Sequence, residues 1–472
     1  MKTINLKKCA LAMGVAAIPA LGMSATSATS GTQTPTVQVS VTAGSQVVSP
    51  YFAPLNVFVP ESTLSYPGQE GVVAHTNYVI HNPNGVIPNV LTDLRQSAPA
   101  ANPTPNTTFS ETPASLACLY GVGPAYTGCV PIINSAYNAT GGSRAIAIVI
   151  AYDNPTVLAD LQNFSSHFGL PAPNFKLVKV VKPTYASANC TSVPANSGWA
   201  LESALDTQWS HAMAPSAVTI LVEACDSSYA QLMLAEQVAA QQLSAYGGGQ
   251  VSNSWGGGEF SGEASYDSVF RSNWVSGQPI SYIFSAGDSG LGAQYPSSSP
   301  WVISAGGTTV NRNGTTKNFV SESCWAGSGG GTSVYETWTN NIATGMGPWT
   351  AFQYPLFGQS ARKTPDISFN ADPASGVSVL YNGSWYVVGG TSVSAPSLAG
   401  IINNSNNRLG VAPSGGGSYT NAENNLLYAQ LLTYSDYKTN FYDVTTGSNG
   451  ASATAGWDYC TGVGSPRGKL GK

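Results

Sequence analysis

Short apolar runs bounded by turn-forming residues recur through the middle of the chain, and they restrict the fold more than any other feature. Five are clear: AIAIVIAYD (145–153), AVTILVEACD (217–226), QVSNSWG (250–256), SYIFSAGD (281–288) and WVISAGG (301–307). Runs of this length are typical of strands that are buried on both faces. Helical stretches such as LMLAEQVAAQQL (232–243) lie between some of them. The alternation predicts an α/β fold with a mainly parallel central sheet flanked by helices.

The composition divides the chain into three segments. Residues 1–28 begin with lysines, continue with an apolar stretch to about Met23 and end in small residues, which predicts a secretory signal peptide. Residues 29–111 are rich in Thr, Ser, Pro, Val and Asn, and they predict a small β-rich segment that is either a short pro-region or a separate module. Residues 112–472 carry the predicted sheet. We expect a secreted protein, extracellular or periplasmic, with no membrane association after signal removal.

The cysteines agree with export. Removal of the signal takes away Cys9 and leaves six cysteines, an even number that predicts up to three disulfides in a secreted protein. Six cysteines allow 15 pairings, and the sequence does not select one set. We expect the pair Cys118–Cys129, because only a short loop with Gly and Pro separates the two residues.

Charge is scarce in this chain. Charged residues are only 9% of the sequence, and the formal net charge is -5. Nucleic-acid binding needs basic patches, so the composition argues against a nucleic-acid partner. Acid denaturation results largely from carboxylate protonation and the net charge that follows, so a surface with few carboxylates suits an acidic medium.

A serine in GGTSVSAPSLAG (389–400) is the first candidate catalytic residue. Ser392 lies between a glycine turn and the start of a predicted helix, where a hydrolase would place a nucleophile. A serine nucleophile normally needs a histidine base. None of the four histidines (His75, His81, His167 and His211) lies in a Gly-rich segment of the kind that presents such a base.

Two carboxylates on a predicted helix are the next candidates. The stretch NSGWALESALDTQWSHAMAP (196–215) predicts a helix that ends near Pro215. Glu202 and Asp206 are spaced i, i+4 and share one face beside an apolar stripe, whereas His211 lies about 180° around the helix from Glu202. Mutual repulsion and partial burial would raise the pKa of these carboxyls. A solvated helix face with two unrelated acids is the alternative.

A third acid, Asp288, ends the run SYIFSAGD between two glycines. Loops at the carboxyl ends of strands are where α/β proteins place ligands and chemistry. A turn aspartate that bonds its own backbone is an equally good interpretation of this residue alone.

Four motifs in order, ESALD, SNSWGGGE, SAGDSG and GGTSVSAP, resemble the sedolisin family of serine-carboxyl peptidases. Residues 112–122, 295–308 and 364–373 are similar to the family as well, so the resemblance covers about residue 112 to the C-terminus. It implies a subtilisin-like fold in which a glutamate replaces the catalytic histidine. It also implies that SNSWGGGE (252–259) lines the substrate cleft. The implied roles are nucleophile for Ser392, general base for Glu202, orientation of the base for Asp206 and the oxyanion hole for Asp288.

The stretch FYDVTTGSNGASATAGWDYCTGVGSP (441–466) resembles the calcium loop of the same family. The match implies one structural calcium ion, and calcium takes six to eight oxygen ligands. The implied ligands are the carboxylates of Asp443 and Asp458 and the carbonyls of Val444, Thr454 and Gly456.

The resemblance leads us to expect a secreted, acid-acting serine-carboxyl peptidase, monomeric, that cleaves peptides or proteins. Endopeptidase action is favoured over tripeptidyl-peptidase action. Because Asp288 donates a hydrogen bond only when protonated, and because we expect burial to raise its pKa by less than three units, we expect activity to peak between about pH 3 and 5. A non-catalytic secreted binding protein on the same scaffold is the alternative. A glycosidase with paired carboxylates would leave GGTSVSAP unexplained.

Overall fold

The structure is a computed structural model of the chain. It describes residues 57–81, 110–272, 279–337, 353, 361–406, 411–415, 418–431, 434–470 and 472. The expected signal peptide, residues 1–28, lies outside the described residues, and the expected β-rich segment is described only at 57–81 and 110–111.

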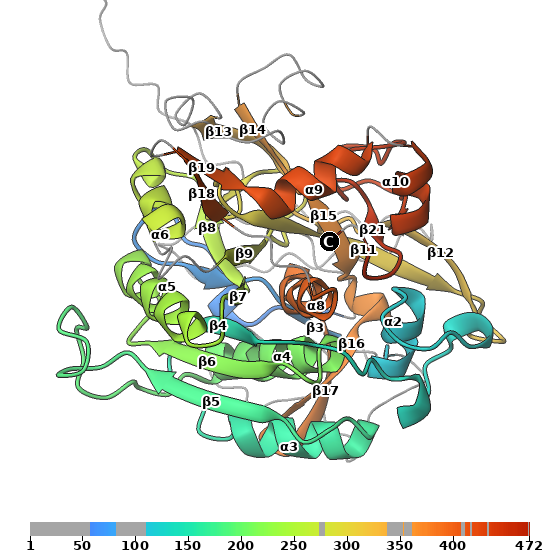
Figure 1. Cartoon of the computed structure of the whole chain (residues 1–472), viewed down its shortest axis with the longest axis horizontal. Helices are drawn as coiled ribbons and strands as arrows, with labels where there is room; N and C mark the ends of the chain where they lie inside the picture. The colour runs from blue at the N-terminus through green and yellow to red at the C-terminus, as the bar shows by residue number, and fades with distance from the viewer. Residues whose placement is uncertain are drawn as a thin grey trace, which may run out of the picture. The chain divides into compact units, whose positions relative to one another are not determined.

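The central sheet is mainly parallel, as predicted (Figure 1). Its main path runs β12-β11-β9-β7-β4-β6-β5. Every neighbouring pair from β11–β9 to β6–β5 is parallel, whereas β12 is antiparallel to β11. Also in this sheet, β15 pairs with β11, and β18 joins β9 and β19. The bounds are β4 Ala145–Ala151, β5 Asn174–Lys179, β6 Val218–Ala224, β7 Gly249–Asn253, β9 Ile280–Ser285, β11 Ile303–Arg312, β12 Phe319–Cys324, β15 Ile367–Asn370, β18 Val411–Gly415 and β19 Ser418–Asn421.

Helices form two apolar layers against this sheet. One buried cluster takes side chains from α2, α4 and α8, and the other takes them from α5 and α6. Strand β4 is buried along its whole length, which explains its unbroken apolar sequence. The bounds are α2 Pro113–Leu119, α3 Val157–Phe168, α4 Ser197–Met213, α5 Tyr229–Ser244, α6 Asp267–Ser272, α8 Thr391–Asn404, α9 Ala422–Leu431 and α10 Tyr434–Asn440.

Helix α4 is enclosed far more completely than its sequence predicts. All residues from Trp199 to Met213 are buried, so the expected single apolar stripe is too narrow. The reason is its close packing against α8 at Gly400. A Cβ atom at Gly400 would lie 2.6 Å from Met213 Cβ and 2.9 Å from the carbonyl oxygen of Ser210, so the two helix backbones approach closely there.

The N-terminal residues 57–81 form three short strands that join the edges of two smaller sheets. One sheet has the order β1-β3-β17-β16 and the other has the order β10-β8-β2. Strands β16 and β17 form a hairpin, with Asn382 and Gly383 at positive φ in its turn. The bounds are β1 Val57–Phe58, β2 His75–Thr76, β3 Val79–His81, β8 Trp255–Gly258, β10 Gln294–Tyr295, β16 Val377–Tyr381 and β17 Ser384–Gly389. Two further pairs are β13 (Gly331–Thr337) with β14 (Ala361–Thr364), and β20 (Phe441–Tyr442) with β21 (Ser465–Pro466).

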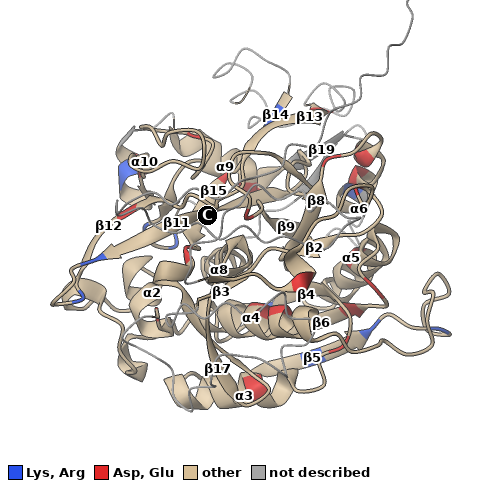
Figure 2. Cartoon of the chain, turned by 180° about the vertical axis from the view of Figure 1, so that it is seen from behind, with Lys and Arg blue, Asp and Glu red and all other residues tan. Residues whose placement is uncertain are grey.

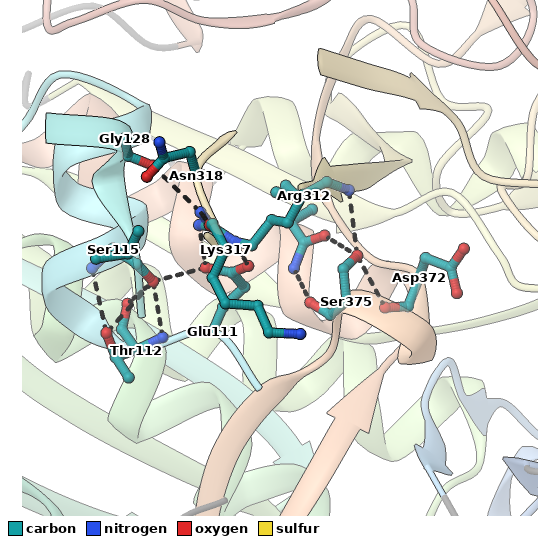
Figure 3. A network of polar contacts seen from close by, with 12 residues as sticks. Glu111, Thr112, Ser115, Gly128, Arg312, Lys317, Asn318, Asp372 and Ser375 are labelled. Atoms are coloured by element: carbon teal, nitrogen blue, oxygen red, sulfur yellow. Dashed lines mark hydrogen bonds and ion pairs between the residues drawn. The ribbon is translucent and has the colours of Figure 1, made fainter. Parts of the chain in front are cut away.

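An ion pair fixes the chain just before α2 (Figure 3). Arg312 donates from Nε to Glu111 Oε1 at 2.5 Å and from Nη2 to Oε2 at 2.7 Å. Ser115 Oγ donates to the same carboxylate at 2.6 Å. This bidentate contact joins Glu111, two residues before the start of α2, to the end of β11.

Three disulfides join cysteines within the described residues, and the expected Cys118–Cys129 bond is one of them. The others are Cys190–Cys225 and Cys324–Cys460. Disulfides fit an extracellular protein. Charged residues are sparse along the ribbon (Figure 2). Across the described ranges, no helix has the length and apolar character that a membrane crossing requires.

Candidate active site

The residue before the predicted nucleophile helix has to be glycine. Gly390 has φ 106°, a conformation that residues with a side chain rarely adopt. A Cβ atom at this position would also overlap Asp288 Oδ2 and the carbonyl oxygen of Asn77. The glycine therefore brings the start of α8 directly against both oxygens, with Ser392 as the second residue of the helix.

The structure brings Ser392 and the two carboxylates of α4 together. Ser392 Oγ donates a hydrogen bond to Glu202 Oε2 at 3.0 Å, and both side chains are fully buried. Ser254 Oγ donates to Asp206 Oδ1 at 2.7 Å. The remaining carboxyl oxygens, Glu202 Oε1 and Asp206 Oδ2, are buried, and the described residues offer them no donor. A proton held between the two carboxyls would satisfy both.

The electrostatics of the pair favour such a shared proton. Burial, followed by the nearby Asp206 carboxylate, raises the pKa of Glu202 well above its ordinary value, and the hydrogen bond from Ser392 opposes this rise. Burial also raises the pKa of Asp206, while the hydrogen bond from Ser254 lowers it. Two carboxyls in this relation titrate as a pair, so one can remain an acceptor for Ser392 while the other holds a proton.

Asp288 lies just beyond the end of β9 and faces the start of α8. Its Oδ1 accepts hydrogen bonds from Thr391 N at 2.7 Å and Thr391 Oγ1 at 2.8 Å. Its Oδ2 is buried, and no described residue donates to it or accepts from it. Burial raises the pKa of Asp288 from 3.8 to about 7, against the lowering effect of the bonds from Thr391. The pKa therefore lies at about the upper limit that the sequence led us to expect.

No histidine takes the place of the base. His211 Nε2 lies 3.0 Å from the carbonyl oxygen of Pro171, on the far side of α4 from Glu202. His75 lies in β2, with Nδ1 3.3 Å from the carbonyl oxygen of Thr76. Within the described residues, Ser392 Oγ donates hydrogen bonds to Glu202 Oε2 and to the carbonyl oxygen of Ser254, and it has no hydrogen bond to an imidazole.

Comparisons with known proteins point to one family, although no family model matches the chain. Kumamolisin from Bacillus sp. (strain MN-32) is 28% identical over 249 residues, which cover 46% of this chain and 41% of that protein. Tripeptidyl-peptidase 1 from Dictyostelium discoideum is 29% identical over 350 residues, covering 69% and 53% respectively. Sedolisin from Pseudomonas sp. (strain 101) is 30% identical over 227 residues, covering 42% and 35%. These similarities support a place for the chain in the sedolisin family.

A solved sedolisin structure agrees on the fold. Pseudomonas sedolisin, a serine-carboxyl proteinase in complex with two molecules of pseudo-iodotyrostatin, aligns with a TM-score of 0.57 and 23% identity. The alignment covers 76% of this chain and 95% of that one, and it shows a common fold. The chain spans about half or less of the length of the three sedolisin relatives that it matches in sequence.

The loop that resembles the sedolisin calcium site offers oxygen ligands, but the carboxylate of Asp458 accepts hydrogen bonds from backbone N–H groups of the loop. The hydroxyl of Tyr437 lies 3.0 Å from Asp443 Oδ1, 3.0 Å from the carbonyl oxygen of Gly456 and 2.9 Å from that of Val463. One hydroxyl proton cannot serve three acceptors, and a hard cation suits such an excess of oxygen. Asp443 Oδ1 also accepts from Gly456 N at 3.0 Å, but the carbonyl oxygens of Gly456 and Val463 still leave more acceptors than donors, which fits calcium.

Asp458 lies in the same loop but is engaged by backbone N–H groups. Its Oδ1 accepts from Cys460 N at 2.9 Å and Thr461 N at 2.8 Å, and its Oδ2 accepts from Thr454 N at 3.1 Å. In this arrangement Asp458 shapes the loop. No cluster of three or more His, Cys, Asp or Glu side chains in metal-binding geometry occurs in the described part of the chain.

Four residues contribute to these sites without having been singled out from the sequence. Ser254 and Thr391 lie inside the quoted motifs SNSWGGGE and GGTSVSAP, so the motifs pointed to them without giving them a role. Val463 and Tyr437 lie outside the matched ligand positions, and only the folded loop brings their oxygens to Asp443.

Proposed function

We propose that this chain is a serine-carboxyl peptidase that hydrolyses peptide bonds through an acyl-enzyme on Ser392. The observation that carries the proposal is the hydrogen bond of 3.0 Å from Ser392 Oγ to Glu202 Oε2, inside a site where no imidazole reaches the serine. Tripeptidyl-peptidase 1, one of the relatives, is a peptidase by name, which supports the same activity.

Each group in the site has a part in this chemistry. Glu202 takes the proton of Ser392 as its oxygen attacks the substrate carbonyl, and later gives the proton to the leaving amine. Asp206, fixed by Ser254, shares a proton with Glu202 and so keeps the base in position. The developing oxyanion is stabilised by the N–H of Ser392 at the start of α8 and by protonated Asp288.

The protonation states that this mechanism requires predict peptidase activity at acidic pH. Asp288 donates only below its pKa, which is about 7 when the cleft is covered. The carboxyl pair of Glu202 and Asp206 must have lost one of its two protons before Glu202 can act as a base. This requirement sets the acidic limit of the pH range of activity. We place the protein outside the cytoplasm as a secreted, monomeric endopeptidase acting on peptides or proteins. The apolar N-terminal stretch and the disulfides support secretion.

A structural calcium ion in the loop 441–466 belongs to the same proposal. Asp443 and the carbonyls of Gly456 and Val463 would hold it, with the expected ligands Val444, Thr454 and Asp458 nearby in the loop. When bound, calcium would neutralise the crowded oxygens and stiffen the loop. The Cys324–Cys460 disulfide already ties this loop to β12.

Replacement of the nucleophile tests the proposed function. Ser392→Ala should lower hydrolysis of a denatured protein substrate at pH 4 by at least about 10³-fold, because no other group can form the acyl-enzyme. Ser394→Ala is the matched control, since Ser394 lies on the same helix, is equally buried and bonds only the carbonyl oxygen of Phe369 among the described residues. Activity of the Ser392→Ala variant within tenfold of the parent would rule out the mechanism.

A further inference from the structure

The N-terminal residues 73–81 run through the active-site cleft as an extended strand. Before the site, β2 pairs antiparallel with β8, with His75 opposite Gly256 and Thr76 opposite Trp255. Beyond the site, β3 pairs antiparallel with β17, with Val79 opposite Gly389. Strand β8 belongs to SNSWGGGE, and β17 leads directly into Ser392. The segment therefore makes sheet pairs on both sides of the nucleophile.

Between these pairs, the carbonyl group of Asn77 lies at the catalytic residues. The N–H of Ser392 donates to the carbonyl oxygen of Asn77 at 2.9 Å. This oxygen and Asp288 Oδ2 both crowd the same side of Gly390, where a Cβ atom would overlap each of them. The carbonyl oxygen of Asn77 thus occupies the place where an oxyanion would be stabilised by a backbone N–H and a carboxyl proton.

The side chains on either side of this carbonyl have specific partners. Asn77 Nδ2 donates to Ser285 Oγ at 2.7 Å, at the end of β9 and three residues before Asp288. Tyr78 is fully buried, and its hydroxyl donates to the carbonyl oxygen of Gly198 at 2.9 Å. The Oγ1 of Thr76 lies 3.0 Å from Ser62 Oγ, within the covering part of the same segment. The segment is therefore held in one register.

We propose that residues 73–81 are an intramolecular substrate of the site, and that the bond cut is Asn77–Tyr78. The inference rests on the proposed peptidase function and extends it to a named bond and to a subsite. The subsite is the position of Asn77, where Ser285 recognises a carboxamide before the bond cut. The position after the bond takes a large aromatic side chain between the segment and α4.

The reaction uses only groups already in place. Ser392 Oγ attacks the carbonyl carbon of Asn77 while its proton passes to Glu202, and the oxyanion is held by Ser392 N–H and protonated Asp288. Glu202 returns the proton to the nitrogen of Tyr78, the C–N bond breaks, and Asn77 remains as an ester on Ser392. Water then hydrolyses the ester with Glu202 as base, which frees the serine and leaves a carboxyl group on Asn77.

Cleavage at this bond separates two parts of the chain with different anchors. The part from Tyr78 onward keeps the pairing of β3 with β17 and the Glu111–Arg312 ion pair. The part that ends at Asn77 keeps β1, β2, the backbone contacts of residues 72–74 with residues 227–229, and the side-chain contacts around Thr76. The uncut chain has its cleft filled by its own residues, so cleavage and departure of the N-terminal part would open the site to other substrates.

The first test follows the full chain as it is produced. After incubation at pH 4, N-terminal sequencing and intact mass should identify a product that begins at Tyr78, and Ser392→Ala should yield none. The rate should be independent of protein concentration over a hundredfold dilution, because the substrate is part of the same molecule. A product that begins elsewhere, or a fully active chain that is never cut at this bond, would overturn the proposal.

The second test concerns the subsite. Asn77→Trp should slow this cut by about 10²-fold, because an indole cannot fit beside Ser285 in the space of a carboxamide. Asn189→Trp is the matched control, since Asn189 is an exposed asparagine that contacts Asp226. An unchanged rate for Asn77→Trp would contradict the assignment of Asn77.

A synthetic peptide with the sequence VAHTNYVIH, residues 73–81, removes any dependence on folding of the variants. The processed protein should cut it between Asn and Tyr, and should cut the version with Trp in place of Asn about 10²-fold more slowly. Hydrolysis of a denatured protein without this cut in either peptide or chain would overturn the inference and leave the proposed function standing. If the protein hydrolyses nothing and Ser392→Ala changes nothing, both are wrong.

Discussion

Replacement of Asp288 by asparagine should remove the alkaline limit of activity. In the structure, Asp288 Oδ1 accepts two hydrogen bonds from Thr391, while Oδ2 shares the crowded space beside Gly390 with the carbonyl oxygen of Asn77. A protonated Oδ2 donates to an oxyanion at that point, whereas an ionised one repels it. An asparagine aligned in the same way would keep both bonds from Thr391 and donate from Nδ2 at every pH.

The pKa of Asp288 gives the size of the effect. With the cleft covered, burial places it at about 7, above the ordinary 3.8. One pH unit above the pKa about one molecule in ten retains the proton, and two units above about one in a hundred. After the segment leaves, water reaches the carboxyl and the pKa should fall toward 3.8. The alkaline limb of peptide hydrolysis therefore belongs between about pH 4 and 7, with a tenfold loss of rate per unit above the pKa.

The assay is kcat/KM for a peptide substrate from pH 3 to 9. Asp288→Asn should keep a flat profile above the acidic limb, which belongs to Glu202 and Asp206 and should not move. Asp288→Ala should lose about 10²- to 10³-fold at every pH, the usual cost of one oxyanion donor. Asp267→Asn is the matched control, because Asp267 is also buried with a pKa of about 7 but accepts its hydrogen bonds from Ser299 and Tyr295 and from none of the catalytic candidates. An alkaline limb unchanged in Asp288→Asn would refute the reasoning.

Two further predictions concern stability. If calcium binds the loop, a chelator at pH 5 should lower the melting temperature. The loss corresponds to about 2.7 kcal/mol of stability when the ion had been present at a hundred times its Kd. Asp443→Ala should have the same effect and abolish the response to chelator, whereas Asp436→Ala, at an exposed acid, should do neither, and an unchanged melting curve with chelator would mean that no ion is held. The free energy of unfolding should be greatest near pH 4 and decrease toward pH 8, because burial raises the folded-state pKa of Glu263 to about 8, of Asp267 to about 7 and of Glu336 to about 10. Between the unfolded-state pKa and the folded-state pKa of each carboxyl, the folded state binds more protons than the unfolded state. Stability is therefore lost as pH rises, by at most about 4 kcal/mol for Asp267 alone. Chemical denaturation curves that show greater stability at pH 8 than at pH 4 would contradict this.

The sequence predicts the sheet and the meeting of the four catalytic candidates because both depend on short-range patterns. Unbroken apolar runs identify buried strands such as β4, and the i, i+4 spacing places Glu202 and Asp206 on one side of α4. The positions of Asp288 and Ser392 follow from a strand end and a helix start. Motif resemblance then assembles these separate local signals into one site.

The parts that the sequence does not predict depend on contacts between distant segments. Strands β2 and β3 have two and three residues, too few for any periodicity, and their register is set by the free edges of β8 and β17. The raised pKa of Asp288 depends on its complete burial in the folded chain. The complete burial of α4 depends on its neighbours, because Glu202 and Asp206 lie on one side of the helix, His211 lies on the opposite side, and all three are enclosed.

The close approach of α4 and α8 at Gly400 also bears on how this protein can change over evolutionary time. Gly400 lies eight residues after Ser392, about 12 Å along the helix axis, and takes no part in the chemistry. Yet any side chain there would press on Met213 and separate the helix that carries the serine from the helix that carries its base. Lineages that keep the activity would have to retain glycine at 400, so a catalogue of intolerant positions would include sites that no substrate ever touches.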